Sequence, residues 1–134
     1  MGPMLALVIE DDHGVGGVFV AALEQAGFTT ELITNGRLAL TRLAAVVPAL
    51  VLLDINLPAV SGEMILQAIR ADSRLAGTRV IVITGEAHRA KALQPGADLV
   101  LVKPVSANQL AELAIRLVTP GTGPLYDDAP PAKS

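Results

Sequence analysis

Six polar residues stand at the ends of aliphatic stretches in this sequence, and their types suit metal and phosphoryl chemistry. In chain order they are Glu10, Asp11, Asp12, Asp54, Thr84 and Lys103. Two or three carboxylates with a main-chain carbonyl form an all-oxygen ligand set suited to Mg²⁺. A hydroxyl and an ammonium can neutralise phosphoryl oxygens, and an aspartate can attack phosphorus. The pattern predicts a phosphoryl site with Asp54 as the nucleophile, provided that the fold brings these residues together.

The aliphatic stretches indicate the strands of a parallel sheet. The run at 49–54 is uninterrupted and bounded by Pro48 and Pro58, which is typical of a strand buried on both faces. The other predicted strands are Leu5–Ile9, Thr29–Thr34, Arg79–Thr84 and Asp98–Val102. Ligands of open α/β sheets bind outside the carboxyl ends of the strands. We therefore expect the polar strand ends to share one crevice.

Helices are predicted between the strands, where apolar residues recur at helical spacing. The predicted ranges are 14–26, 37–47, 63–72 and 106–118, with a brief polar segment at 86–94 in the fourth position. Asp12 and Ser106 suit N-caps, and Gly27 suits the residue that ends a helix. Asn35 and Gly36 suggest a turn. The residues of the third helix expected to face inward are Met64, Ile65, Ala68 and Ile69.

This alternation predicts an α/β fold, a doubly wound five-stranded parallel sheet with helices on both faces. The chain has 134 residues, which is a one-domain length. We expect the domain to occupy 1–118, and the remainder, 119–134, is predicted to be a disordered tail because prolines and glycines are scattered among small polar residues.

Composition excludes several classes of protein. The chain has no cysteine, which excludes thiolate metal sites and thiol nucleophiles. No apolar run reaches the roughly 18 residues of a membrane span, so we expect a cytoplasmic protein. The net charge is only -3, and four acids of the predicted site account for it. The rest of the chain has no basic patch, so direct nucleic-acid binding is not expected.

Three other patterns receive structural interpretations. The stretch 14–19 resembles a dinucleotide fingerprint, but Phe19 occupies the third glycine position and three acids precede it, where a pyrophosphate would approach. His13 and His88 are expected to be surface residues, because an oxygen-lined site prefers hard ions. The arginines expected on solvated helix faces and loops are Arg37, Arg42, Arg70, Arg74 and Arg79.

The ordered set of motifs resembles the receiver domain of two-component response regulators over residues 4–118. The matching residues are Glu10, Asp11, Asp54, Leu57, Pro58, Gly62, Thr84, Gly85, Lys103 and Pro104. The resemblance implies the flavodoxin-like strand order 2-1-3-4-5. It also implies that Asp54 accepts a phosphoryl group from a histidine kinase or a phosphotransfer protein and passes the signal to a downstream protein.

The same resemblance implies a role for each site residue. Glu10, Asp11, Asp54 and the main-chain carbonyl of Asn56 would position Mg²⁺. The side chains that would bind the phosphoryl oxygens are those of Thr84 and Lys103, with a cis bond before Pro104. Such a protein is a signalling phosphoacceptor and not an enzyme with a separate substrate, and we expect a monomer or a weak homodimer.

The chain departs from the family pattern at the expected output face. Val100 stands three residues before Lys103, where receivers usually have a tyrosine or phenylalanine that turns inward on activation. The interval from Thr84 to Gly96 is also about three residues short, nearly one helical turn. We therefore expect intact chemistry with an unusual output surface. Asn56 and Glu86 resemble those of chemotaxis-type regulators and predict a short-lived acyl phosphate.

Two alternative functions remain open at this point. Phosphohydrolases of the haloacid dehalogenase type also use aspartate, Mg²⁺, threonine and lysine, but their nucleophile lies on the earliest strand and is followed two residues later by another aspartate. Here that second place holds Asn56. The other alternative is an interaction module that kept these residues without being phosphorylated. Separately, the alternative interpretation of 10–12 is a solvated acidic turn that caps the next helix. The sequence fits either a stand-alone receiver or part of a longer protein.

Overall fold

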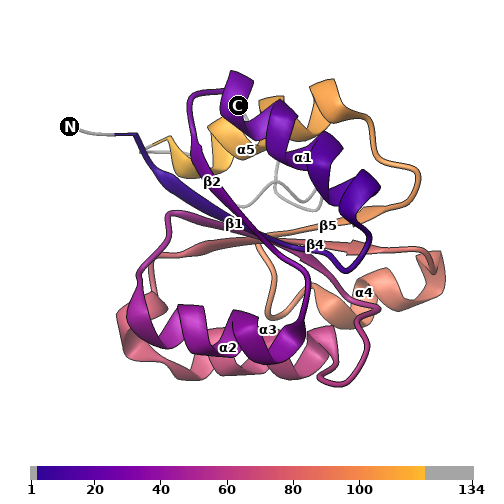
Figure 1. Cartoon of the computed structure of the whole chain (residues 1–134). Helices are drawn as coiled ribbons and strands as arrows, with labels where there is room; N and C mark the ends of the chain where they lie inside the picture. The colour runs from indigo at the N-terminus through magenta and orange to yellow at the C-terminus, as the bar shows by residue number, and fades with distance from the viewer. Residues whose placement is uncertain (1–2, 120–134) are drawn as a thin grey trace, which may run out of the picture.

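A computed structural model describes residues 3–119 of the chain, so the predicted tail lies outside the described residues except for Thr119. Five parallel strands form one sheet in the order β2-β1-β3-β4-β5, as expected (Figure 1). The strands are β1 (Leu5–Ile9), β2 (Thr29–Ile33), β3 (Leu50–Asp54), β4 (Arg79–Thr84) and β5 (Leu99–Val102). Each boundary lies within one residue of its predicted place.

Helices cover both faces of the sheet (Figure 1). They are α1 (His13–Gln25), α2 (Gly36–Ala45), α3 (Gly62–Ala71), α4 (Ala90–Leu93) and α5 (Ala107–Val118), with two 3₁₀ turns, η1 (Ser73–Leu75) and η2 (Ala87–Arg89). α1 and α5 pack on one face, and α2, α3 and α4 pack on the other. α4 has only four residues, so the segment predicted to be brief is a 3₁₀ turn followed by one turn of helix.

Strand residues alternate between two hydrophobic clusters, one on each face of the sheet. Val51 and Leu53 of β3 contribute to the cluster under α2 and α3, whereas Leu50 and Leu52 contribute to the cluster under α1 and α5. All four side chains are buried. This double burial explains why the β3 sequence is a continuous apolar run, 50–53, without a polar face.

Short polar side chains begin the helices. Asp12 accepts a hydrogen bond from Val15 N at 3.0 Å, and Ser106 accepts one from Gln109 N at 3.2 Å, as predicted. Gly27 follows the end of α1 with φ 103°, a conformation that favours glycine. The turn predicted at Asn35 is wrong: its side chain caps α2, which begins directly at the next residue.

The predicted inward face of α3 is wrong in part. Ile65 and Ile69 are buried as expected, but Met64 is 59% exposed and Leu66 is buried instead. Ala68 is also exposed. The cause is Gly62, where a Cβ would lie 2.5 Å from Ile55 Cα, so this residue must face the sheet and it fixes the rotation of the helix.

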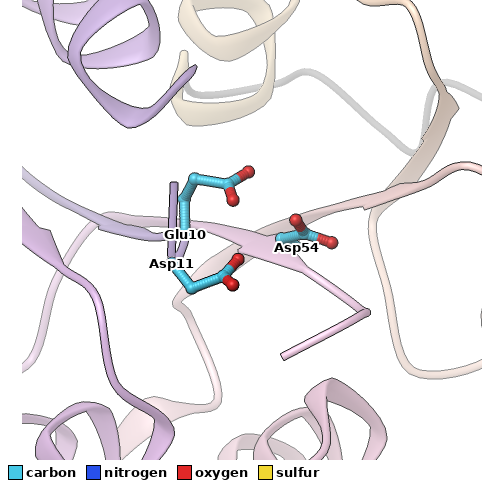
Figure 2. A group of neighbouring side chains, drawn as sticks. All are labelled: Glu10, Asp11 and Asp54. Atoms are coloured by element: carbon cyan, nitrogen blue, oxygen red, sulfur yellow. The ribbon is translucent and has the colours of Figure 1, made fainter. Parts of the chain in front are cut away.

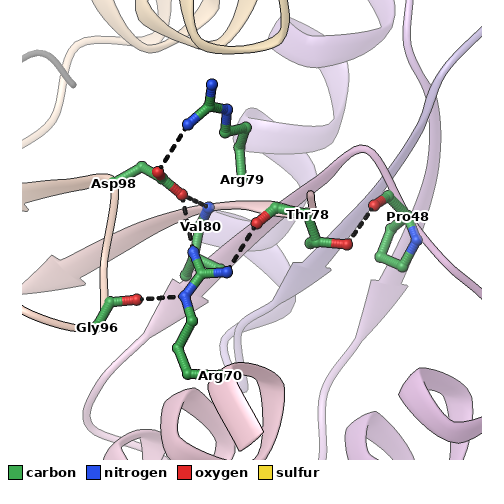
Figure 3. A network of polar contacts seen from close by, with 7 residues as sticks. All are labelled: Pro48, Arg70, Thr78, Arg79, Val80, Gly96 and Asp98. Atoms are coloured by element: carbon green, nitrogen blue, oxygen red, sulfur yellow. Dashed lines mark hydrogen bonds and ion pairs between the residues drawn. The ribbon is translucent and has the colours of Figure 1, made fainter. Parts of the chain in front are cut away.

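A polar network joins the amino ends of β4 and β5, at the edge of the sheet away from Asp54 (Figure 3). Arg70 of α3 donates to Gly96 O at 2.7 Å, to Thr78 O at 3.0 Å and to Asp98 Oδ2 at 2.8 Å. Arg79 donates to Asp98 Oδ1 at 3.0 Å. Arg70 lies on an exposed helix face, as expected, and Arg79 is half-buried. The sequence did not reveal that Arg70 also joins α3 to the segment that leads into β5.

The carboxyl ends of β1 and β3 lie side by side (Figure 2). The chain runs from β1 outward to β2, and then returns to the other side of β1 to form β3. This is the topological switch point of the sheet, the place where open α/β folds bind ligands. Within residues 3–119, no helix is both long enough and apolar enough to cross a bilayer.

We expect Asp98→Ala to destabilise the fold by about 2 to 4 kcal/mol, because it leaves two partly buried arginines without their carboxylate. Urea unfolding at neutral pH measures the change. Glu31→Ala is the matched control, since it removes the exposed carboxylate that pairs with Arg42, and it should cost less than about 1 kcal/mol. Equal losses in the two variants would contradict a special role for the Arg70 network.

Candidate functional site

Three carboxylates meet at the switch point (Figure 2). Oxygen atoms of Glu10, Asp11 and Asp54 all lie within 4.8 Å of one another. Glu10 is 3% exposed and Asp54 is 4% exposed, whereas Asp11 lies open to solvent. Among residues 3–119, this is the one group of three or more acids, histidines or cysteines close enough to share a metal ion. The site therefore opens on the side of Asp11.

Two further strand ends bring a cation and a hydroxyl to the same edge. Lys103 Nζ donates to Asp54 Oδ2 at 3.2 Å, and its peptide bond to Pro104 is cis, as the family resemblance implied. Thr84 is fully buried at the end of β4, one residue beyond the pairing of Asp54 with Ile83. The cluster thus faces an ammonium and lies beside a hydroxyl.

The loop after β3 orients the Asp54 carboxylate. Asn56 N donates to Asp54 Oδ1 at 2.9 Å, while Lys103 holds the other oxygen. Gly62 lets α3 begin directly against this loop, because a Cβ there would lie 2.9 Å from Asp54 O. The Asp54 side chain is therefore held through both of its oxygens.

The Glu10 carboxylate is buried beside another acid, and only one of its two oxygens has a hydrogen-bond partner. Burial raises its pKa from 4.5 to about 7, the hydrogen bond from Asp12 N opposes this rise, and the neighbouring Asp54 adds to it. Glu10 Oε2 accepts the Asp12 bond at 3.1 Å, but Oε1 is buried with no hydrogen-bond partner. A hard divalent cation ligated by this oxygen would satisfy it and relieve the repulsion among the acids, so the donor set fits such an ion.

The structure brings together most of the predicted site residues. Glu10, Asp11 and Asp54 lie within reach of one another, and Lys103 donates to Asp54. Thr84 ends the adjacent strand, and Asn56 contacts Asp54 through its main chain. The predicted surface histidines, His13 and His88, are exposed and belong to no acid cluster. The roles of the site residues stay predictions.

Arg89 lies beside the site, although it is not among the site residues predicted from the sequence. Its guanidinium donates to Asn56 Oδ1 at 3.5 Å and pairs with Glu63 and Glu86. The only sequence signal was the spacing of Glu86 and Arg89, three residues apart, which suits pairing on one helical turn. The contact with Asn56 depends on how the two loops come together, so sequence spacing does not reveal it.

The fold and this edge define a class of protein, a doubly wound α/β domain with an acid cluster beside a lysine and a threonine. The chain belongs to the response regulator receiver domain family, whose model matches residues 6–115. Membership decides against the haloacid dehalogenase alternative.

Curated relatives are longer proteins. The DNA-binding response regulator MtrA of Mycobacterium tuberculosis is 33% identical over 107 residues, which cover 78% of this chain and 46% of that protein. Response regulator Rre1 of Synechocystis is 32% identical over 120 residues, covering 87% of this chain and 52% of that protein. The chain thus spans about half the length of the curated relatives it matches.

Solved structures agree with the fold. The chemotaxis response regulator CheY4 of Vibrio cholerae is 25% identical, with a TM-score of 0.77 over 86% of this chain and 98% of that chain. A sensor protein from Polaromonas is 28% identical, with a TM-score of 0.77 over 87% of this chain and 95% of that chain.

In the absence of divalent ions, we expect Glu10→Gln to stabilise the protein at pH 8 by about 2 kcal/mol. The folded state holds the Glu10 proton more tightly than the unfolded state does, so the stability of the parent protein should fall as pH rises from 4.5 to about 7. The variant should lack this loss. Urea unfolding at several pH values in a chelator measures both, and a parent protein at least as stable as the variant at pH 8 would contradict the expectation.

Proposed function

We propose that this domain accepts a phosphoryl group on Asp54 from a phosphohistidine donor. The carrying observation is the buried Asp54 carboxylate, held by Lys103 next to a second buried acid, Glu10, whose Oε1 has no partner. Family membership supports the same role. The proposed ligands of Mg²⁺ are Glu10, Asp11, Asp54 and the main-chain carbonyl of Asn56. When bound, Mg²⁺ supplies positive charge that offsets the charge of the phosphoryl oxygens and the carboxylates.

The proposed chemistry is one displacement at phosphorus. An Asp54 oxygen attacks the phosphorus in line, the bond between phosphorus and the histidine nitrogen breaks, and the nitrogen leaves with the electron pair. The product is an acyl phosphate on Asp54 and a neutral imidazole on the donor. Lys103 exchanges its hydrogen bond with Asp54 for one to a phosphoryl oxygen, and the Thr84 hydroxyl donates to another.

The proposed partners follow from this chemistry. The donor is a histidine kinase or a phosphotransfer protein, and the receptor of the signal is a downstream protein. We assign the receiver to residues 1–118. The proposal does not include nucleic-acid binding by these residues. The MtrA relative is named a DNA-binding protein, and this chain matches 46% of it.

The proposed output face differs from the usual pattern of receivers. Val100 lies on β5 and packs against the cluster under α2 and α3, so no aromatic ring is present there to turn inward. α4 offers one helical turn to a partner. We propose that phosphorylation repositions the loops after β3 and β4 and leaves the α4 and β5 surface little changed.

Incubation with acetyl phosphate and Mg²⁺ should add one phosphoryl group, detected by intact mass. Asp54→Asn should abolish the addition, because the amide is a poor nucleophile, and Lys103→Met should slow it at least tenfold, roughly the effect of one lost donor at a phosphoryl group. A chelator should also suppress it. A parent protein that gains no mass would favour the interaction module that is never phosphorylated.

Amide hydrogen exchange with and without beryllofluoride, a phosphoryl mimic, should show protection in the loops after β3 and β4. Exchange in α4 and β5 should change little, because Val100 replaces the aromatic residue that would transmit the change. Protection of α4 equal to that of the site loops would contradict the proposed output face.

A further inference from the structure

Arg89 connects the two loops that flank Asp54. Its Nη1 donates to Asn56 Oδ1 at 3.5 Å and lies 3.7 Å from Glu86 Oε2, and its Nη2 pairs with a carboxylate oxygen of Glu63. The Arg89 side chain is 26% exposed, less than either glutamate. One guanidinium thus joins η2 to the loop after β3 and to the first turn of α3.

The residues that Arg89 holds are the ones next to the proposed chemistry. Asn56 N donates to Asp54 Oδ1 at 2.9 Å, and Glu86 N donates to Thr84 Oγ1 at 3.1 Å. The main chains of Asn56 and Glu86 therefore contact the acceptor and the hydroxyl. Asn56 Oδ1 and Glu86 Oε2 lie toward Arg89, and Glu86 Oε1 lies toward His88. Arg89 therefore competes with water for Asn56 Oδ1 and Glu86 Oε2.

We propose that Arg89 is a positioning residue that slows hydrolysis of the acyl phosphate on Asp54, an inference that rests on the proposed function. In hydrolysis, a water oxygen attacks phosphorus, the bond to the Asp54 oxygen breaks, and Asp54 regains its carboxylate with the electron pair. The water proton passes to solvent, and inorganic phosphate leaves. Asn56 and Glu86 can orient this water or accept its proton only when Arg89 releases them.

These contacts of Arg89 argue for a longer-lived acyl phosphate than Asn56 and Glu86 alone predict. The sequence predicted a short lifetime because Asn56 and Glu86 resemble the residues of chemotaxis-type regulators. The guanidinium opposes fast loss of the phosphoryl group by competing with water for an oxygen of each side chain. Glu63 serves as the anchor, because it binds Arg89 from the first turn of α3.

The test measures the first-order loss of the phosphoryl group from the isolated phosphorylated full chain by intact mass. Arg89→Met should lose it about two- to fivefold faster than the parent, the range given by partly exposed ion pairs. Arg89→Lys should lie between the two, and Glu63→Gln should accelerate loss to a smaller extent. Arg42→Met is the matched control, because it removes another arginine paired with a glutamate, and it should leave the rate unchanged.

A second comparison separates positioning from a general loosening of the fold. In a background with both Asn56→Ala and Glu86→Ala, adding Arg89→Met should leave the rate of loss unchanged, because the side chains that it releases are gone. Acceleration that persists in this background overturns the inference, as does an Arg89→Met variant that keeps the parent lifetime. Failure of the parent protein to gain a phosphoryl group on Asp54 overturns the proposed function instead, and the inference with it.

Discussion

Burial of two carboxylates at adjacent strand ends is the constraint on which the site depends. Glu10 and Asp54 lie almost completely out of water, and the repulsion between them is not balanced within the acid cluster itself. Lys103 balances part of it from the far side, and Asn56 N fixes one Asp54 oxygen. The remaining uncompensated negative charge is concentrated at Glu10, and a bound cation would offset it. The fold tolerates this arrangement because the residues of β1 and β3 that precede these acids are apolar and pack on both faces of the sheet.

The edge of the sheet also explains why four distant segments, at the ends of β1, β3, β4 and β5, can form one site. Parallel strands present their carboxyl ends on the same side, so a polar residue at the end of each strand needs no long loop to reach its neighbours. Gly62 brings α3 close to the end of β3, and the loop between them is short and fixed to Asp54. The residues that contact Asp54 therefore come largely from strand ends and main-chain groups and not from long loops.

The strands, and the meeting of Glu10, Asp11 and Asp54 at one sheet edge, could be predicted from the sequence because both follow from short-range patterns. A strand buried on both faces must be an apolar run, and a polar residue at its end must reach the sheet edge. The orientation of α3 could not be predicted, since Met64 and Leu66 both fit a helical stripe and the contact of Gly62 with β3 decides between them. The partners of Arg70 and Arg89 could not be predicted either, because they lie on elements that are distant in the sequence.

Arg70 occupies a position at which lysine cannot replace arginine without loss of contacts. Three separate nitrogens of its guanidinium contact two main-chain oxygens and one carboxylate. A lysine keeps the charge but is a compact point donor on a flexible stem, so it cannot span the same three acceptors. An exchange of Arg70 for lysine would therefore break part of this network, although position 70 lies at the opposite edge of the sheet from the acid cluster.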